Sequence, residues 1–157
     1  MAKPKIRIPD EPALRERLER ECDKASHVQL CRYALGLAAH ILALTGDPHP
    51  DHAALQEGFR TCGLWQKGLA SVQEVRRCGF QIHQMARASG NAIARAAWRV
   101  AGHAVATAHM REHAMVASDY AVQVVSLLHP DSMDEVRKER FWQIRHLAEI
   151  GKSPDGT

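Results

Sequence analysis

The chain has 157 residues, the length of one ordinary domain, and carries a net charge of +3 without any block of like charge. Its 45% hydrophobic and 25% charged residues exclude an extensively disordered chain. The weak, dispersed positive charge argues against nucleic acid or a membrane surface as a partner.

The cysteines and the longest apolar run predict a cytoplasmic protein. Cys22, Cys31, Cys62 and Cys78 show no C-x-x-C spacing and no signal peptide is recognised before them, which predicts reduced thiols. The longest uncharged run, residues 33–46, has 14 residues. A membrane-spanning helix needs about 20 apolar residues. We therefore expect this run to be a core helix.

Three segments follow from the distribution of prolines and apolar residues. Residues 1–9 contain two prolines among basic and apolar residues, and they predict a flexible arm. Residues 10–150 predict a single helical domain. Residues 151–157 are polar and predict a flexible tail.

Helix starts and ends are marked by known capping signals. Pro12 follows two acidic residues, which suits the first turn of a helix. A serine stands three residues before Glu or Gln at Ser26, Ser71 and Ser132, which is the spacing of a capping box. Gly46 follows the core run and predicts its end.

The stretch 91–128 is expected to form the centre of the domain. Between Val100 and Met110 it is apolar nearly all round, apart from two histidines and a threonine. One straight helix of this length would span about 57 Å at 1.5 Å per residue, which exceeds the size of such a small domain. We therefore expect a break near His113-Ala114.

The last helix is expected to be amphipathic. Val136, Phe141, Ile144 and Leu147 should face the bundle, whereas Arg137, Lys138 and Arg140 should face solvent. No segment shows sustained two-residue alternation with β-branched residues, so no sheet is expected. The predicted fold is all-α, a single-domain bundle of about seven helices around a buried Ala-rich central helix.

A histidine pair in the central stretch suggests a metal site. His109 and His113 are four residues apart, so on a helix both imidazoles could reach one metal ion. His103 lies about 120° further round and could join them only across a bend. A third ligand would come from another helix, with His83, His40 and Cys62 as the available candidates. The alternative interpretation is a pair of hydrogen-bonded histidines at the core or its rim.

No complete catalytic constellation is visible. His103 is expected to be a buried imidazole bonded to a backbone carbonyl or a hydroxyl. An acid–base role would need an orienting carboxylate, and neither Glu112 nor Asp119 lies one helical turn away. A nucleophile elbow, a Walker loop and a Gly-rich dinucleotide turn are all missing. We therefore predict no catalytic residue and no cofactor.

Several arginines are close together in the sequence. Arg76, Arg77 and Arg87 could contribute to a basic face that reads DNA. An ordinary solvated helix face is the simpler interpretation.

Separated segments of the chain resemble one bacterial family. The Ala-rich run 94–109 ends in A-G-H-A-V-A-T-A-H and is followed by His113-Ala114 and Tyr120-Ala121; Trp65-Gln66-Lys67-Gly68 and residues 139–143 flank it. With these segments the chain resembles small all-α immunity proteins over roughly residues 26–147. It departs from them at residues 49–52, where the family tends to have Arg-Pro, and at Leu147-Ala148, where it tends to have Leu-Pro.

The resemblance implies a small cytoplasmic protein that neutralises a toxin by binding it, without a reaction or a cofactor. The residues that match the family motifs carry no assigned role: Trp65, His103, His109, His113, Tyr120, Trp142 and Gln143.

Two functions remain open from the sequence. The leading hypothesis is a non-enzymatic interaction protein that neutralises a toxin or bacteriocin as its protein partner. The alternative is a metal-binding helical bundle, or a metalloenzyme, that uses His109 and His113. The sequence does not predict the oligomeric state.

Overall fold

The computed structural model describes residues 3–152, and these residues form seven helices and no strand. The expected all-α fold is therefore confirmed. In chain order the helices are α1 (Pro12–Lys24), α2 (His27–Thr45), α3 (Ala53–Gln66), α4 (Val72–Ala88), α5 (Ala92–Ala106), α6 (His113–Leu128) and α7 (Met133–Gly151). The last five residues of the predicted tail lie outside the described residues.

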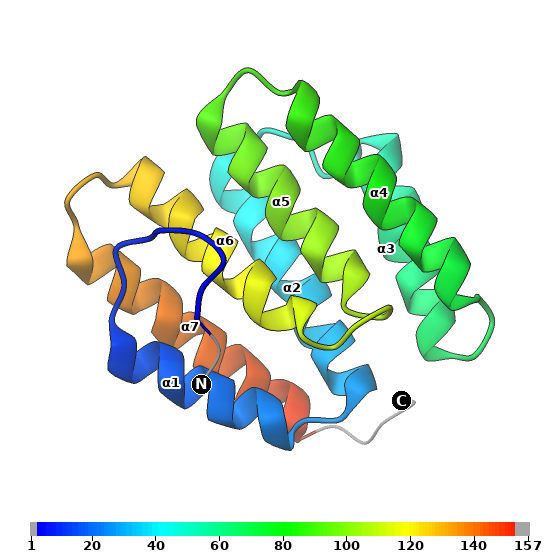
Figure 1. Cartoon of the computed structure of the whole chain (residues 1–157), viewed down its shortest axis with the longest axis horizontal. Coiled ribbons are helices and arrows are strands. Elements are labelled where there is room, and N and C mark those ends of the chain that lie inside the picture. The colour runs from blue at the N-terminus through cyan, green and yellow to red at the C-terminus, as the bar shows by residue number, and fades with distance from the viewer. Residues whose placement is uncertain (1–2, 153–157) are drawn as a thin grey trace.

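Two apolar helices, α2 and α5, form the centre of the bundle. α2 contacts α3, α5, α6 and α7, whereas α5 contacts α2, α3, α4 and α6. Ten of the 15 residues of α5 are buried, as expected for the Ala-rich central helix. Figure 1 shows α4 beside α5 on one side of the molecule and α1 beside α7 on the other.

Within the described residues, α2 is the one helix long and apolar enough to cross a membrane by length and composition alone. Its residues Tyr33, Leu37 and Ile41 are fully buried against neighbouring helices. Packing in the core accounts for this apolar character.

The capping signals in the sequence correspond to real helix ends. Ser26 and Gln29 form a complete capping box, and Gly46 ends α2 in the left-handed conformation with a φ of 66°. The side chains of Ser71 and Ser132 accept hydrogen bonds from the backbone N–H groups three residues later. Hydrogen bonds between residues close in sequence thus fix several of the helix ends.

The predicted break in the central stretch is confirmed, but it begins earlier than expected. α5 ends at Ala106, and the Thr107 hydroxyl donates a hydrogen bond to the carbonyl of His103 at 3.0 Å. The turn that follows is held by a residue of another helix, since His27 Nε2 on α2 donates a hydrogen bond to the Thr107 carbonyl at 2.6 Å. Arg111 donates to the carbonyls of Cys22 and Ala25 at 3.0 and 2.8 Å. Partners from other helices therefore set the position of this break.

The expected orientation of α7 was wrong at two positions. Arg140 is fully buried, whereas Phe141 is 40% exposed. The reason is a set of carboxylates on the neighbouring segments, which the Arg140 guanidinium binds. Three other expected core residues, Val136, Ile144 and Leu147, are buried.

Candidate functional site

The break between α5 and α6 brings together histidines that are distant in the sequence. His103 lies near the end of α5 and His113 at the first position of α6. Their Nδ1 atoms are 2.9 Å apart, so one ring donates a hydrogen bond to the other. His103 therefore has an imidazole as its partner, instead of the expected carbonyl or hydroxyl.

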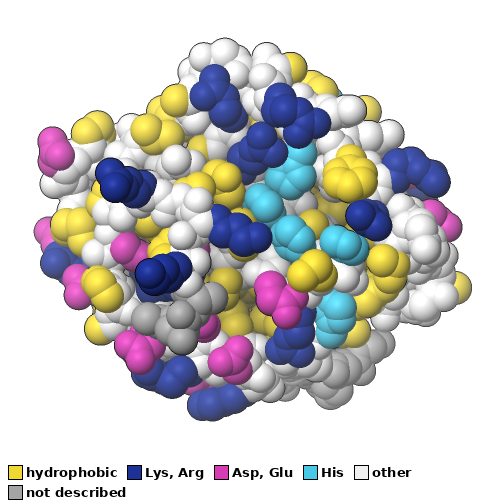
Figure 2. Space-filling view, in the orientation of Figure 1, with side chains coloured by type: hydrophobic (Ala, Val, Ile, Leu, Met, Phe, Trp, Pro, Cys, Tyr) yellow, Lys and Arg dark blue, Asp and Glu magenta, His cyan; other side chains and the backbone are white. Residues whose placement is uncertain are grey.

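Further rings extend this pair into a cluster. His83 on α4 packs edge-on against His103 with 4.6 Å between ring centroids, and Tyr120 on α6 stacks on His103 at 5.3 Å. The ring of His109 lies 5.8 Å from that of His113. We call these five residues, His83, His103, His109, His113 and Tyr120, the histidine face. Figure 2 shows histidine side chains gathered on the visible surface, with Lys and Arg side chains around them.

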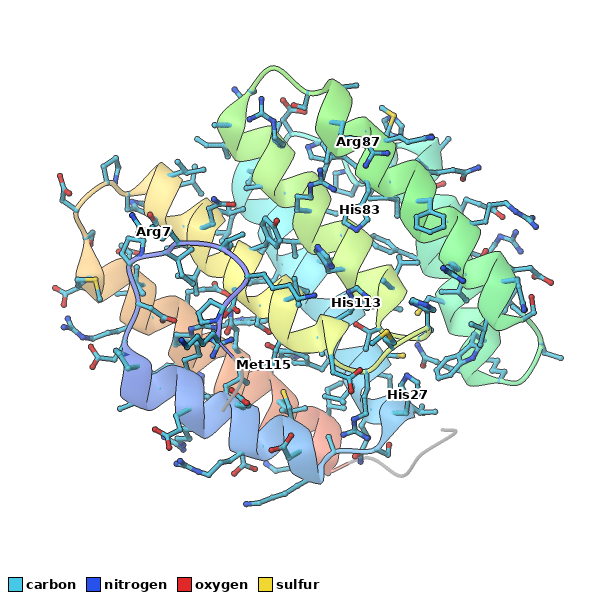
Figure 3. The ribbon with its side chains drawn as sticks, viewed as in Figure 1. Arg7, His27, His83, Arg87, His113 and Met115 are labelled. Atoms are coloured by element: carbon cyan, nitrogen blue, oxygen red, sulfur yellow. The ribbon has the colours of Figure 1, made fainter. Side chains whose placement is uncertain are left out.

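A glycine allows the close contact between α4 and α5. The His83 ring lies directly on Gly102, where an added Cβ would be only 2.6 Å from Cε1 of the ring. The Nδ1 atom of His83 is 2.7 Å from a guanidinium nitrogen of Arg99. Because the guanidinium can only donate, Nδ1 of His83 accepts this hydrogen bond. Figure 3 shows His83 and His113 on the same side of the molecule.

Three imidazoles of this face, those of His83, His103 and His113, are neutral at pH 7 because their pKa values are lowered. Burial, with the positive charge of Arg99, lowers the pKa of His83 to about 4. Burial, with the neighbouring His83 and His113, lowers the pKa of His103 to about 2. Burial also lowers the pKa of His113, and His109 adds to this effect. The face therefore offers neutral donors, acceptors and flat ring surfaces that lose little hydration energy when a partner covers them.

The predicted metal ligands are only partly brought together. His109 does not share a helix face with His113, because it lies in the turn before α6. His83 is near the pair, but His40 binds Glu139 at 2.7 Å, and the Cys62 side chain is a buried free thiol that is hydrogen-bonded with the Cys31 thiol. Among residues 3–152, no three His, Cys, Asp or Glu side chains are arranged to hold a metal ion. Metal binding remains a prediction, and it now centres on His103 and His113.

Four arginines surround the histidine face without a carboxylate partner. On α4, Arg76, Phe80, His83 and Arg87 are spaced by four, three and four residues, so they share one side of the helix. On α5, Arg99 lies about one turn and Arg95 about two turns before His103. We call Arg76, Arg87, Arg95 and Arg99 the arginine rim. Within the described part of the chain, none of these four guanidinium groups forms an ion pair.

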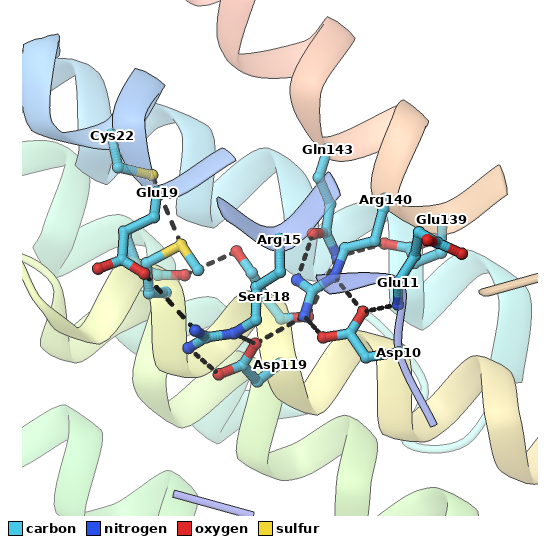
Figure 4. Close-up of polar contacts among 12 residues, drawn as sticks. Asp10, Glu11, Arg15, Glu19, Cys22, Ser118, Asp119, Glu139, Arg140 and Gln143 are labelled. Carbon is cyan, nitrogen blue, oxygen red and sulfur yellow. Dashed lines mark hydrogen bonds and ion pairs between the residues drawn. The ribbon is translucent and has the colours of Figure 1, made fainter. Parts of the chain in front are cut away.

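A second group of polar residues lies buried between α1, α6 and α7, and we call it the polar seam. Asp119 accepts two hydrogen bonds from Arg15, both at 2.9 Å, and one from Arg140 at 2.7 Å. Asp10 accepts two more from Arg140, at 3.0 and 2.8 Å. Gln143 completes the seam by accepting from Arg140 at 2.9 Å (Figure 4). Every charge in this group has an opposite charge beside it.

The residues of the family motif divide between these two places. His103, His109, His113 and Tyr120 form most of the histidine face, whereas Gln143 belongs to the polar seam. Trp142 stacks on His40 with 3.7 Å between ring centroids. Trp65 packs against His27, whose imidazole fixes the turn after α5. The motif therefore combines one group of partly exposed residues with several that stabilise the bundle.

A small cavity adjoins the histidine face. It has a volume of about 210 Å³ and lies between the N-terminal residues, α1 and the beginning of α6, with Lys5, Cys22, His113 and Met115 among its lining residues. Pockets for drug-sized ligands usually measure about 300–1,000 Å³. This cavity is below that range, so the exposed face is the better candidate for recognition.

The sequence alone does not predict the arginine rim as a part of the site. For Arg76 and Arg87 the sequence favours an ordinary solvated helix face, and nothing in the sequence links Arg99 to them. Their spacing along α4 and α5 was visible in the sequence. Their position beside the histidines was not, because it depends on how α4 packs against α5.

Comparison with known families gives a match over residues 20–150, which is most of the chain. Comparisons with curated proteins and with solved structures give no match. The chain therefore belongs to the family described as Imm-5 like putative immunity protein.

Proposed function

We propose that this protein is a non-enzymatic immunity protein that neutralises a toxin by binding it in the cytoplasm. The observation that carries the proposal is the family match over residues 20–150. The geometry supports it, since the histidine face presents flat neutral rings and hydrogen-bonding groups at the surface. Among the described residues, no carboxylate contacts His83, His103 or His113, so an acid–base dyad is not assembled there.

The test is co-expression with candidate toxin domains taken from the genes adjacent to this one. Each domain is expressed from an inducible promoter, with and without this protein, and growth is measured. We expect rescue from one toxin and a stable complex with it in size-exclusion chromatography. If a lethal toxin domain from the neighbouring genes is neither bound nor neutralised, the proposal is wrong.

The ratio of the two proteins separates binding from catalysis. An inhibitor that acts by occupancy loses its effect once the toxin is in molar excess. An enzyme that modifies the toxin would neutralise it at substoichiometric amounts, given time. We therefore expect residual toxin activity to reach zero near a one-to-one ratio and to stay unchanged on longer incubation.

The contact between His103 and His113 favours transition-metal binding as a second candidate function. Neutral imidazole is the form that binds metal ions, and both rings are neutral. Elemental mass spectrometry of protein purified without a histidine tag tests this function. A double replacement of His103 and His113 by alanine should abolish the metal content, whereas the same change at the exposed His49 and His129 should not. A metal-free protein that also takes up no added zinc or nickel would rule it out.

A further inference from the structure

The positive charge of the protein is concentrated on one pair of helices. Residues 72–106, which form α4, α5 and the loop between them, contain five arginines and one acidic residue, Glu74. The sequences of α1 and α7 each contain four basic and four acidic residues. The basic character of the whole chain therefore originates on the side that carries the histidine face.

Several arginines elsewhere in the molecule are paired with carboxylates. Arg15 and Arg140 bind buried carboxylates, and Arg60 and Arg137 pair with neighbouring acidic residues. The arginine rim has no such partners among residues 3–152. Its charge is therefore available to a molecule that approaches from outside.

Exposed apolar side chains lie within the same surface. Phe80 is 57% exposed between Arg76 and His83 on α4, and the Arg76 guanidinium lies 5.5 Å from the centre of its ring. Met110, in the turn between α5 and α6, is 50% exposed beside His109. Protein interfaces are enriched in arginine, methionine and aromatic residues. This combination is typical of a surface that binds a protein.

We propose that the toxin docks on the surface formed by α4, α5 and the turn before α6, and that it presents a carboxylate-rich patch to the arginine rim. Phe80 is the apolar anchor of this interface, and the histidine face lies beside it. The inference rests on the proposed function, because it assumes that the partner is a toxin. An acidic protein surface fits better than nucleic acid, since Phe80 is exposed beside Arg76 and the adjoining turn carries the acidic Glu112.

Charge reversal at two exposed positions tests the docking surface. The double variant Arg76→Glu/Arg87→Glu leaves the contact between Arg99 and His83 intact. The control, Arg17→Glu/Arg145→Glu, makes the same charge change at exposed positions on α1 and α7. Association and dissociation rates with the neutralised toxin are measured by biolayer interferometry at several salt concentrations. We expect association of the α4 variant to slow by about tenfold or more at low salt, with a weaker salt dependence, and the control to change by less than about threefold.

Phe80→Ala provides a second measurement that does not depend on charge. It should raise the dissociation rate by about tenfold or more, as expected for an interface anchor, with little effect on association. If wild-type protein binds the toxin and all three variants bind equally well, the docking surface is wrong and the proposed function stands. If wild-type protein binds no toxin, both fail.

A 20-base-pair DNA duplex serves as the competing probe. Charge-sensitive binding of this duplex at about 150 mM salt, with no binding of the toxin, would assign the surface to nucleic acid and overturn the proposal. Binding of the toxin that the duplex cannot displace supports it.

Discussion

The polar seam and the histidine face differ in how their charges are satisfied. In the seam, the carboxylates of the partly buried Asp10 and the buried Asp119 both face the guanidinium of Arg140. On the face, neutral imidazoles lie beside arginines that have no ion pair within the described residues. The charges of the seam are therefore neutralised within the molecule, whereas the arginines beside the histidine face can still bind carboxylates of another molecule. This contrast predicts a stabilising role for the seam and supports the binding role proposed for the face.

The largest expected effect is the loss of Arg140. Replacing it by alanine leaves the Asp10 and Asp119 carboxylates with one fewer buried positive partner, although Arg15 still binds Asp119. Breaking a buried ion pair in this way costs about 3–5 kcal/mol of unfolding free energy. Urea unfolding followed by circular dichroism measures this loss. Arg145→Ala, on the exposed side of the same helix, should change stability by less than about 0.5 kcal/mol. Similar values for the two variants would contradict a stabilising role for the seam.

Much of the fold could be predicted from the sequence because its signals are local. Ser26, Ser71, Ser132 and Gly46 mark helix ends through contacts within a few residues. Apolar periodicity also predicted the central position of the stretch 91–128. The orientation of Arg140 could not be predicted in this way, since its carboxylate partners lie on other elements. A charged residue at the edge of an apolar stripe is usually exposed, and only the tertiary partners reverse that tendency.

The arrangement of the candidate site was also hard to predict, because its contacts join residues of different helices. His109 and His113 were treated as a pair on one helix, but the turn at residues 107–112 pairs His113 with His103. That turn depends on His27 and Arg111, which act across helices. The contact of His83 with Gly102 likewise depends on the packing of α4 on α5. Sequence spacing identified the residue types of the site but not their arrangement.

The second-largest expected effect is a loss of stability at acidic pH, which originates at the histidine face. The pKa of His83 is about 4 in the folded protein, against about 6.5 for an unperturbed histidine. Between pH 6.5 and 4 the unfolded chain therefore binds more protons at this residue, so stability falls as the pH falls. His103, with a pKa of about 2, acts in the same direction.

Each of the two residues loses about 2 kcal/mol of stability between pH 7 and 5. We therefore expect the melting temperature to fall by roughly 10 °C over this range, since 1 kcal/mol corresponds to about 2–4 °C at this chain length. The variant His103→Gln should show a smaller decrease, whereas His49→Gln in the exposed loop should behave as the wild type. An NMR titration that finds half-protonation of His83 or His103 near pH 6.5 would refute this explanation.

A smaller effect is expected at the glycine below His83. Gly102→Ala places a Cβ 2.6 Å from the His83 ring, so the ring must rotate outward and loses its hydrogen bond with Arg99. Alanine also favours the helix by about 1 kcal/mol, which offsets part of the cost. We expect a net loss of about 1 kcal/mol in urea unfolding and a pKa of His83 closer to 6.5 by NMR.

Gly79→Ala is the matched control for this change. Its new Cβ would meet nothing closer than 3.8 Å, an ordinary contact, so only the helix preference acts. The variant should gain about 0.5–1 kcal/mol and leave the NMR signals of His83 unchanged. If both glycine variants gain stability, the close contact with Gly102 does not hold the His83 ring in its position.

The smallest effect on stability is expected where the effect on binding is largest. Arg76 and Arg87 are exposed, and neither forms an ion pair among the described residues. The double change to glutamate should therefore alter the unfolding free energy by less than about 0.5 kcal/mol. A loss above about 2 kcal/mol in urea unfolding would show that these arginines stabilise the bundle, and the separation between a stabilising seam and a recognising face would then fail.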